Sequence, residues 1–172
     1  AQLKIAGIDE TPLPDLSWID DPAVDALGLP ERFALLVPGS APHRPAKRWP
    51  AERYGLLAQR LAAVGVVPVI LGNEAERGLA ARIRSLCPEA LDLTGRTTLP
   101  TVGGLARRAV AACGNDTGPM HLIAMVGCPS VVLFSASSDP ARAAPRGPSV
   151  TVIQRRSLAD LSVDSVAAAL PL

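Results

Sequence analysis

Short apolar runs that alternate with longer amphipathic stretches constrain the fold of this chain more than any other feature of its sequence. The runs are FALLVP at 33–38, VVPVIL at 66–71, LDL at 91–93, AVAAC at 109–113, SVVLF at 130–134 and VTVI at 150–153. Strands that are apolar on both faces and separated by helices are typical of a parallel sheet. The sequence therefore predicts an α/β fold, a Rossmann-like parallel sheet with helices on both faces.

Helical spacing fills the intervals between these runs. The clearest case follows Pro50, where Tyr54, Leu57 and Leu61 recur at helical intervals and Gly65 ends the pattern. Further helices are expected at 75–86, at 99–108, from about 117, and at 157–170.

The domain organisation follows from changes in pattern along the chain. Residues 1–30 contain scattered Pro and Asp without a sustained period, so we predict a linker or lead-in there. One domain is expected over residues 31–172, and within it the Pro/Ser/Arg-rich stretch 135–149 is expected to be a long loop. The chain begins without Met and with no signal-peptide pattern, so we expect it to be part of a longer protein.

Charge and composition exclude several function classes. With 17 basic and 16 acidic residues the formal charge is +1, so no nucleic-acid partner and no polybasic membrane patch is expected. No apolar run approaches the ~20 residues of a membrane-spanning helix. The three cysteines, which include no CxxC pair, are interpreted as core thiols.

Polar loops follow four of the predicted strands. Ligands of parallel α/β sheets bind outside the carboxyl ends of the strands, where these loops lie. Residues 38–49 hold Ser40, Lys47 and two arginines, which suit an anion. In GNEAER, Glu74 and Glu76 suit ribose hydroxyls, and TGRTT leaves backbone groups open to a flat ring. Taken singly, residues 38–49 are equally well explained as solvated surface and TGRTT as a glycine turn with a helix cap, and GNEAER is better explained as an acidic first helical turn.

The loop CGNDTGPMH at 113–121 carries more information. Asp116 or Thr117 can cap the next helix, whose first amides, together with Gly118, then form an anion pocket that His121 borders. A metal site of Cys113, Asp116 and His121 is disfavoured because no second pair of ligands has zinc-like spacing. A serine hydrolase is disfavoured because no GxSxG motif is present.

From about residue 30 onward the chain resembles the C-terminal half of the ADP-heptose:lipopolysaccharide heptosyltransferase family, glycosyltransferase family 9. The motifs that carry the resemblance are PGS…KRWP, E-x-Y-x-x-L-A-x-x-L, VIL-G-x-E-x-E, L-T-G-x-T-x-L, GNDTGPMHLIA and LF…DP. The resemblance implies the second Rossmann-like domain of a GT-B glycosyltransferase, which holds the nucleotide-sugar donor. It implies an ADP-sugar as donor substrate and no cofactor or metal.

The resemblance also implies roles for individual residues. The residues that it places at the donor are Ser40, Lys47, Glu76 (less favoured, Glu74), Thr97, Asp116, Thr117, Gly118 and His121. Lys47 would contact the diphosphate, Glu76 the ribose and the backbone around Thr97 the adenine. Asp116, Thr117 and Gly118 would bind the pyrophosphate and sugar. Lys47, Asp116 and His121 are the candidate catalytic residues, because Lys47 and His121 would stabilise charge on the leaving diphosphate.

Partners and location follow from the same resemblance. The acceptor would be a lipid-linked saccharide held, with the general base, by an N-terminal domain that this chain lacks, so we expect little transfer by this chain alone. The whole protein would be cytoplasmic, with peripheral association at the inner membrane. Where the family commonly has Gly-Pro-Thr before Asp-Pro, this chain reads SASSDP, which leaves the sugar open. A nucleotide-sugar epimerase and a non-catalytic nucleotide-binding module remain as alternatives.

Overall fold

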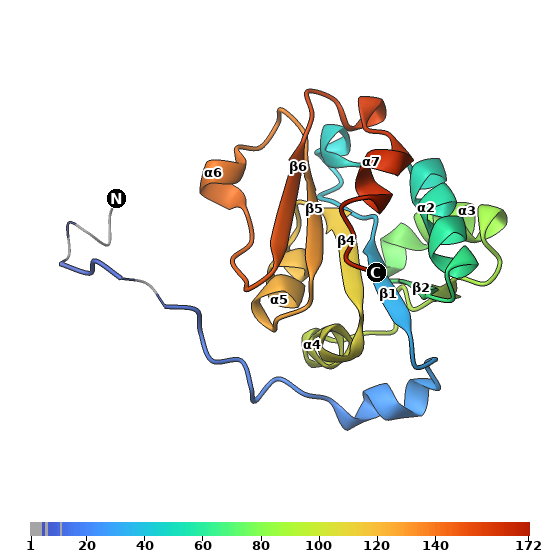
Figure 1. Cartoon of the computed structure of the whole chain (residues 1–172), viewed down its shortest axis with the longest axis horizontal. Coiled ribbons are helices and arrows are strands. Elements are labelled where there is room, and N and C mark those ends of the chain that lie inside the picture. The colour runs from blue at the N-terminus through green and yellow to red at the C-terminus, as the bar shows by residue number, and fades with distance from the viewer. Residues whose placement is uncertain (1–4, 6, 11) are drawn as a thin grey trace.

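Six parallel strands form one sheet at the centre of the molecule (Figure 1). The structure, a computed structural model, describes residues 5, 7–10 and 12–172. The strands are β1 (Phe33–Val37), β2 (Val67–Ile70), β3 (Leu91–Asp92), β4 (Ala111–Asn115), β5 (Ser130–Phe134) and β6 (Val150–Gln154). Their order is β3-β2-β1-β4-β5-β6, and every neighbouring pair is parallel. The predicted α/β, Rossmann-like fold is confirmed.

Helices cover both faces of this sheet. They are α2 (Ala51–Ala63), α3 (Arg77–Leu86), α4 (Leu99–Arg108), α5 (Gly118–Met125), α6 (Pro140–Ala143) and α7 (Val163–Ala167). Short 3-10 helices are η1 (Pro22–Leu27), η2 (Pro45–Lys47), η3 (Glu74–Glu76) and η4 (Leu158–Asp160). None of the helices in the described ranges is long and apolar enough to cross a membrane.

Alternate residues of β1 feed two separate apolar clusters. Leu36 packs with Leu57 of α2 and Ile83 of α3, whereas Leu35 packs with Leu105 of α4 and Ile123 of α5 on the other face. Side chains of a strand alternate between its faces, so a central strand that feeds two helical layers must be apolar throughout. This requirement explains why FALLV carries no polar residue.

Two of the predicted elements differ from the structure. The strand predicted at 109–113 runs from Ala111 to Asn115, so Gly114 and Asn115 belong to the sheet. The helix predicted at 157–170 is wrong as a continuous element, because η4 and α7 are separate. Ser157 and Ser162 each accept a hydrogen bond from an amide two or three residues further on, and each thereby starts a new short helix.

The lead-in contains structure of its own. Asp21 caps η1, and Ile19 and Val24 are buried against α4. Gly103 and Gly104 permit this contact, because a Cβ on Gly103 would lie 2.2 Å from the Ile19 side chain and one on Gly104 3.0 Å from that of Val24. The boundary predicted between residues 30 and 31 stays a prediction. The loop 135–149 likewise contains α6, which Asp139 caps.

Candidate functional site

The strand order places a crevice between β1 and β4. From β1 the chain proceeds to β2 and β3 on one side, and from β4 to β5 and β6 on the other. The loops that follow β1 and β4 therefore run in opposite directions and leave a crevice between them at the carboxyl ends of the strands. Doubly wound sheets bind their ligands in this crevice. The loops at this point are residues 38–50 after β1 and residues 116–117 after β4.

Asn115 joins these two loops from within the core. Its side chain has no exposed surface. Its Oδ1 accepts hydrogen bonds from Trp49 N (3.0 Å) and the Tyr54 hydroxyl (3.2 Å), and its Nδ2 donates to the carbonyls of Pro38 (2.8 Å) and Gly39 (3.1 Å). The amide thus fixes both ends of the loop 38–50. Sequence reasoning missed this residue, although an Asn that ends an apolar strand is the kind of buried polar group that needs several partners.

Lys47 and Asp116 meet across the crevice. Lys47 Nζ lies 2.5 Å from Asp116 Oδ2, and the side chains are 12% and 7% exposed. The same oxygen accepts a hydrogen bond of 2.7 Å from Ser138 Oγ, while Oδ1 lies 4.0 Å from His121 Nε2. The three residues predicted to be catalytic are therefore brought together. Ser138 was not predicted to belong to this cluster, because its place depends on the path of the chain after β5.

Helix α5 begins beside this cluster without a side-chain cap. The N-cap residue is Thr117, whose hydroxyl donates to the Asn115 carbonyl at 3.2 Å, and no cap hydrogen bond is made. The prediction that the side chain of Asp116 or Thr117 caps the helix is therefore wrong, although Thr117 occupies the N-cap position. A Cβ added to Gly118 would meet no atom within 4 Å, so the space beside the first turn is open. Pro119 has no N–H, and the amides of Met120 and His121 donate to the Thr117 carbonyl, so the Gly118 amide at the positive end of the helix is the first-turn donor that suits an anion.

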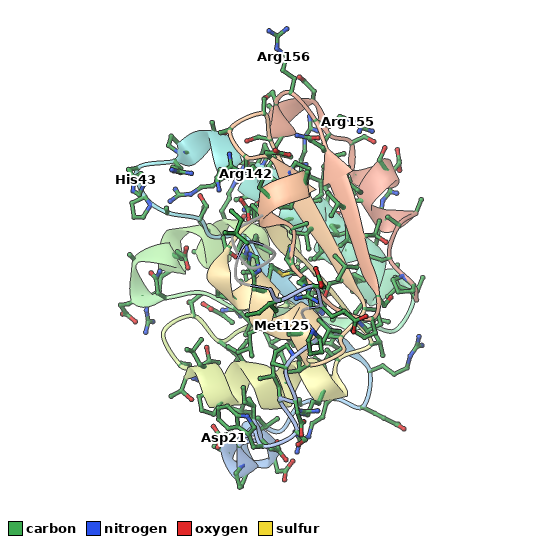
Figure 2. All side chains as sticks on the ribbon, turned by 90° about the vertical axis from the view of Figure 1, so that its left-hand side faces the viewer. Asp21, His43, Met125, Arg142, Arg155 and Arg156 are labelled. Atoms are coloured by element: carbon green, nitrogen blue, oxygen red, sulfur yellow. The ribbon has the colours of Figure 1, made fainter. Side chains whose placement is uncertain are left out.

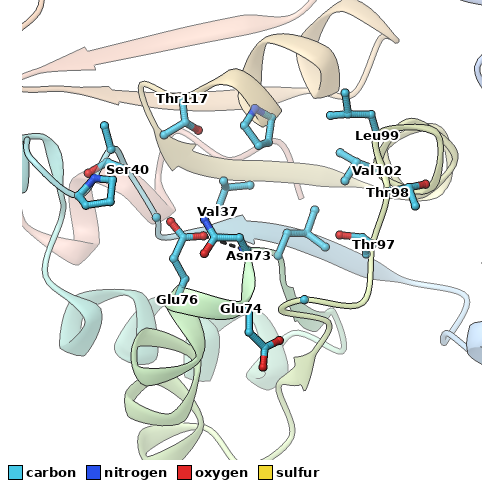
Figure 3. A pocket seen from close by; sticks show the side chains of 17 residues that line it. Val37, Ser40, Asn73, Glu74, Glu76, Thr97, Thr98, Leu99, Val102 and Thr117 are labelled. Carbon is cyan, nitrogen blue, oxygen red and sulfur yellow. Dashed lines mark hydrogen bonds between the residues drawn. The ribbon is translucent and has the colours of Figure 1, made fainter.

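A pocket of about 490 Å³ opens next to the cluster, on the side of β1, β2 and β3 (Figure 3). Of the predicted site residues, those that line it are Ser40, Glu74, Glu76, Thr97 and Thr117. Lys47, Asp116, Gly118 and His121 lie outside its lining, and Thr117 is the link between the two groups. The volume lies within the range of about 300–1,000 Å³ found for small-molecule sites.

Within the pocket the two candidate acidic residues differ. Glu76 accepts a hydrogen bond of 2.9 Å from Asn73 N, and a Cβ on Gly39 would lie 1.8 Å from its carboxylate. Glu74 points away from Glu76 (Figure 3) and pairs with Arg77 at 2.7 Å, with 71% of its side chain exposed. The geometry thus favours Glu76 over Glu74 as the pocket carboxylate, and Gly39 leaves the space that Glu76 occupies.

Ser40 makes hydrogen bonds within the loop that follows β1. Arg48 donates to Ser40 Oγ and to the Ser40 carbonyl, each at 3.0 Å, and the hydroxyl donates to the Arg44 carbonyl at 3.3 Å. These hydrogen bonds hold Ser40 as part of the pocket wall. His43 and Arg142, which Figure 2 labels, are exposed near the same edge of the sheet.

The cysteines take no part in this site. Cys87, Cys113 and Cys128 are buried free thiols, and burial raises the pKa of each, for Cys128 to about 12. Cys113 packs in the core beside α2, so the metal site that would include it is not formed. Among the residues that the structure describes, no three His, Cys, Asp or Glu side chains are grouped to hold a metal.

The sheet order, together with the pocket at the carboxyl ends of the strands, defines a doubly wound α/β domain. The model of glycosyltransferase family 9 (heptosyltransferase) matches residues 17–166, and the chain belongs to this family. The family favours a transferase over the epimerase alternative.

Similar proteins carry heptosyltransferase names. The chain is 33% identical over 115 residues to lipooligosaccharide heptosyltransferase 2 of Haemophilus influenzae. The aligned region covers 64% of the chain and 33% of that protein. The structure of Escherichia coli ADP-heptose lps heptosyltransferase II superposes with a TM-score of 0.76 at 26% identity, over 94% of the chain and 51% of that structure. The structure of a family 9 glycosyl transferase from Veillonella parvula has a TM-score of 0.80 at 21% identity, over 96% of the chain and 56% of that structure. At this identity the similarity shows the fold alone. The chain thus spans about half of these structures and a third of the curated relative.

Proposed function

We propose that this chain is the donor-binding domain of a glycosyltransferase that moves a heptose or a related sugar from an ADP-sugar. The observation that carries the proposal is that two features lie side by side at the crevice of a family 9 domain. One is the 490 Å³ pocket with Glu76, and the other is the Lys47–Asp116 pair beside the open first turn of α5. The first suits a nucleoside, and the second a diphosphate and its sugar.

The order of these groups gives the donor a direction. Adenine would lie toward Thr97 and ribose at Glu76, both of which line the pocket. The diphosphate would pass Thr117 and Gly118 to reach Lys47, and the sugar would lie at Asp116 and His121. The N-terminal end of α5 and the Lys47 ammonium at the diphosphate would stabilise the charge that develops there as the sugar leaves.

The acceptor half of the reaction is assigned to other parts of the protein. We place the lipid-linked saccharide acceptor of the lipopolysaccharide core and the general base in a region of the relatives that this chain does not match. The chain alone then binds donor with little transfer. The whole protein is proposed to work in the cytoplasm, at the inner face of the membrane.

A calorimetric titration of the 172-residue chain tests the proposed donor. We expect ADP to bind at least tenfold more tightly than UDP, because the pocket around Thr97 and Glu76 would accept the flat purine ring. AMP serves as the control for the diphosphate and should bind more weakly than ADP. Tighter binding of UDP than ADP would refute the ADP-sugar assignment, and binding of neither would refute a donor site.

We also propose that donor binding needs no metal ion. Lys47 provides an ammonium, and the N-terminal end of α5 provides the positive end of a helix dipole, where the diphosphate would lie. The affinity for ADP is therefore expected to change less than twofold between buffer with EDTA and buffer with Mg²⁺, as measured by the same titration. A loss of tenfold or more in the affinity for ADP in EDTA, reversed when Mg²⁺ is added back, would contradict this proposal.

A further inference from the structure

We propose that Ser138 is a positioning residue that orients the carboxylate of Asp116 toward the sugar of the donor. This inference rests on the proposed function. Ser138 Oγ donates to Asp116 Oδ2 at 2.7 Å, the oxygen that Lys47 also contacts at 2.5 Å. Both donors thus fall on one oxygen, and the other, Oδ1, is turned toward His121.

The two donors approach Asp116 from opposite sides of the crevice. Lys47 belongs to the loop after β1, and Ser138 belongs to the loop after β5. Two donors on one oxygen from different directions fix the plane of a carboxylate, which rotates readily about its last torsion when only one is present. Without Ser138, the carboxylate would be free to turn both oxygens to the ammonium and to withdraw Oδ1 from the sugar side.

Ser138 is itself held in place by the backbone around it. Its amide donates to the Ser135 carbonyl at 3.2 Å, its carbonyl accepts from Gln154 Nε2 at 3.5 Å, and the following residue, Asp139, caps α6. The hydroxyl is therefore delivered from a turn anchored to β5 and β6. A rigidly placed supporting donor of this kind keeps a ligand-binding carboxylate in one orientation.

The role predicts a selective effect on the donor sugar. In the Ser138→Ala chain we expect the affinity for ADP-heptose to fall about tenfold and the affinity for ADP, which has no sugar, to fall less than twofold. Ser138→Thr keeps the hydroxyl and should restore ADP-heptose binding to within twofold. Ser137→Ala is the matched control, because Ser137 bonds to Ser135 and not to Asp116.

Calorimetric titration of the four chains with both probes decides the matter. Equal losses for ADP and ADP-heptose, no loss, or failure of Ser138→Thr to restore binding would each overturn the role of Ser138 while leaving the donor site intact. Failure of the unaltered chain to bind ADP-heptose would refute the proposed function and the role of Ser138 together. A thermal melt of each variant, expected within about 2 °C of the unaltered chain, separates misfolding from loss of binding.

Discussion

Replacing Asn115 by Ala is expected to lower the free energy of unfolding by about 3–5 kcal/mol. The amide makes four hydrogen bonds in a fully buried position, so its loss leaves the Trp49 amide and two backbone carbonyls without this partner, whereas the Tyr54 hydroxyl keeps the Val37 carbonyl. Each such buried group costs roughly 1–3 kcal/mol, reduced here by local relaxation. Urea denaturation monitored through tryptophan fluorescence measures the change.

The other asparagine of the chain provides a control. Asn73 accepts one hydrogen bond from Ala75 N at the exposed start of η3, so Asn73→Ala should cost only about 0.5–2 kcal/mol. If the two variants unfold at the same urea concentration, Asn115 does not join the loops as inferred. Asn115→Asp keeps the acceptor oxygen and loses the donor, so it should also be strongly destabilised because it brings a charge into the core.

The sheet was predictable because its signal is local. FALLV and SVVLF are short apolar runs bounded by turns, and β5 coincides with the predicted 130–134. The end of β4 was missed because Gly114 and Asn115 do not have the composition of a strand. Gly114 is required there by tertiary contact, since a Cβ would lie 2.6 Å from the Met120 sulfur and 2.8 Å from Val37 Cβ. A sequence pattern does not contain that constraint.

The candidate site was predictable to the extent that each residue lies on a loop after a strand. This placed Lys47, Asp116 and Glu76 at one edge of the sheet, and the family resemblance selected among them. The partners Asn115 and Ser138 depend on how loops distant in sequence approach one another. Their contacts are set by packing, and no spacing within the chain indicates them.

Asp116→Asn is expected to raise the ratio of the ADP-heptose dissociation constant to that of ADP at least tenfold. Asn keeps an oxygen that accepts from Ser138 and Lys47, so the cluster should stay assembled and the melting temperature should stay nearly normal. The negative charge beside the diphosphate is removed, so Lys47 is less strongly held and ADP should bind about two- to fivefold more tightly. A sugar hydroxyl, by contrast, would lose a charged acceptor, which costs about 1.5–3 kcal/mol.

The opposite signs distinguish this role from a general electrostatic one. Asp139→Asn removes the same charge one residue beyond Ser138, where the carboxylate is exposed and caps α6, so it should leave the ratio unchanged. A variant that bound ADP and ADP-heptose more tightly by equal factors would show that Asp116 acts only as the partner of Lys47. In that case the sugar would have to be held elsewhere, and His121 at 4.0 Å from the same carboxylate would be the next residue to replace.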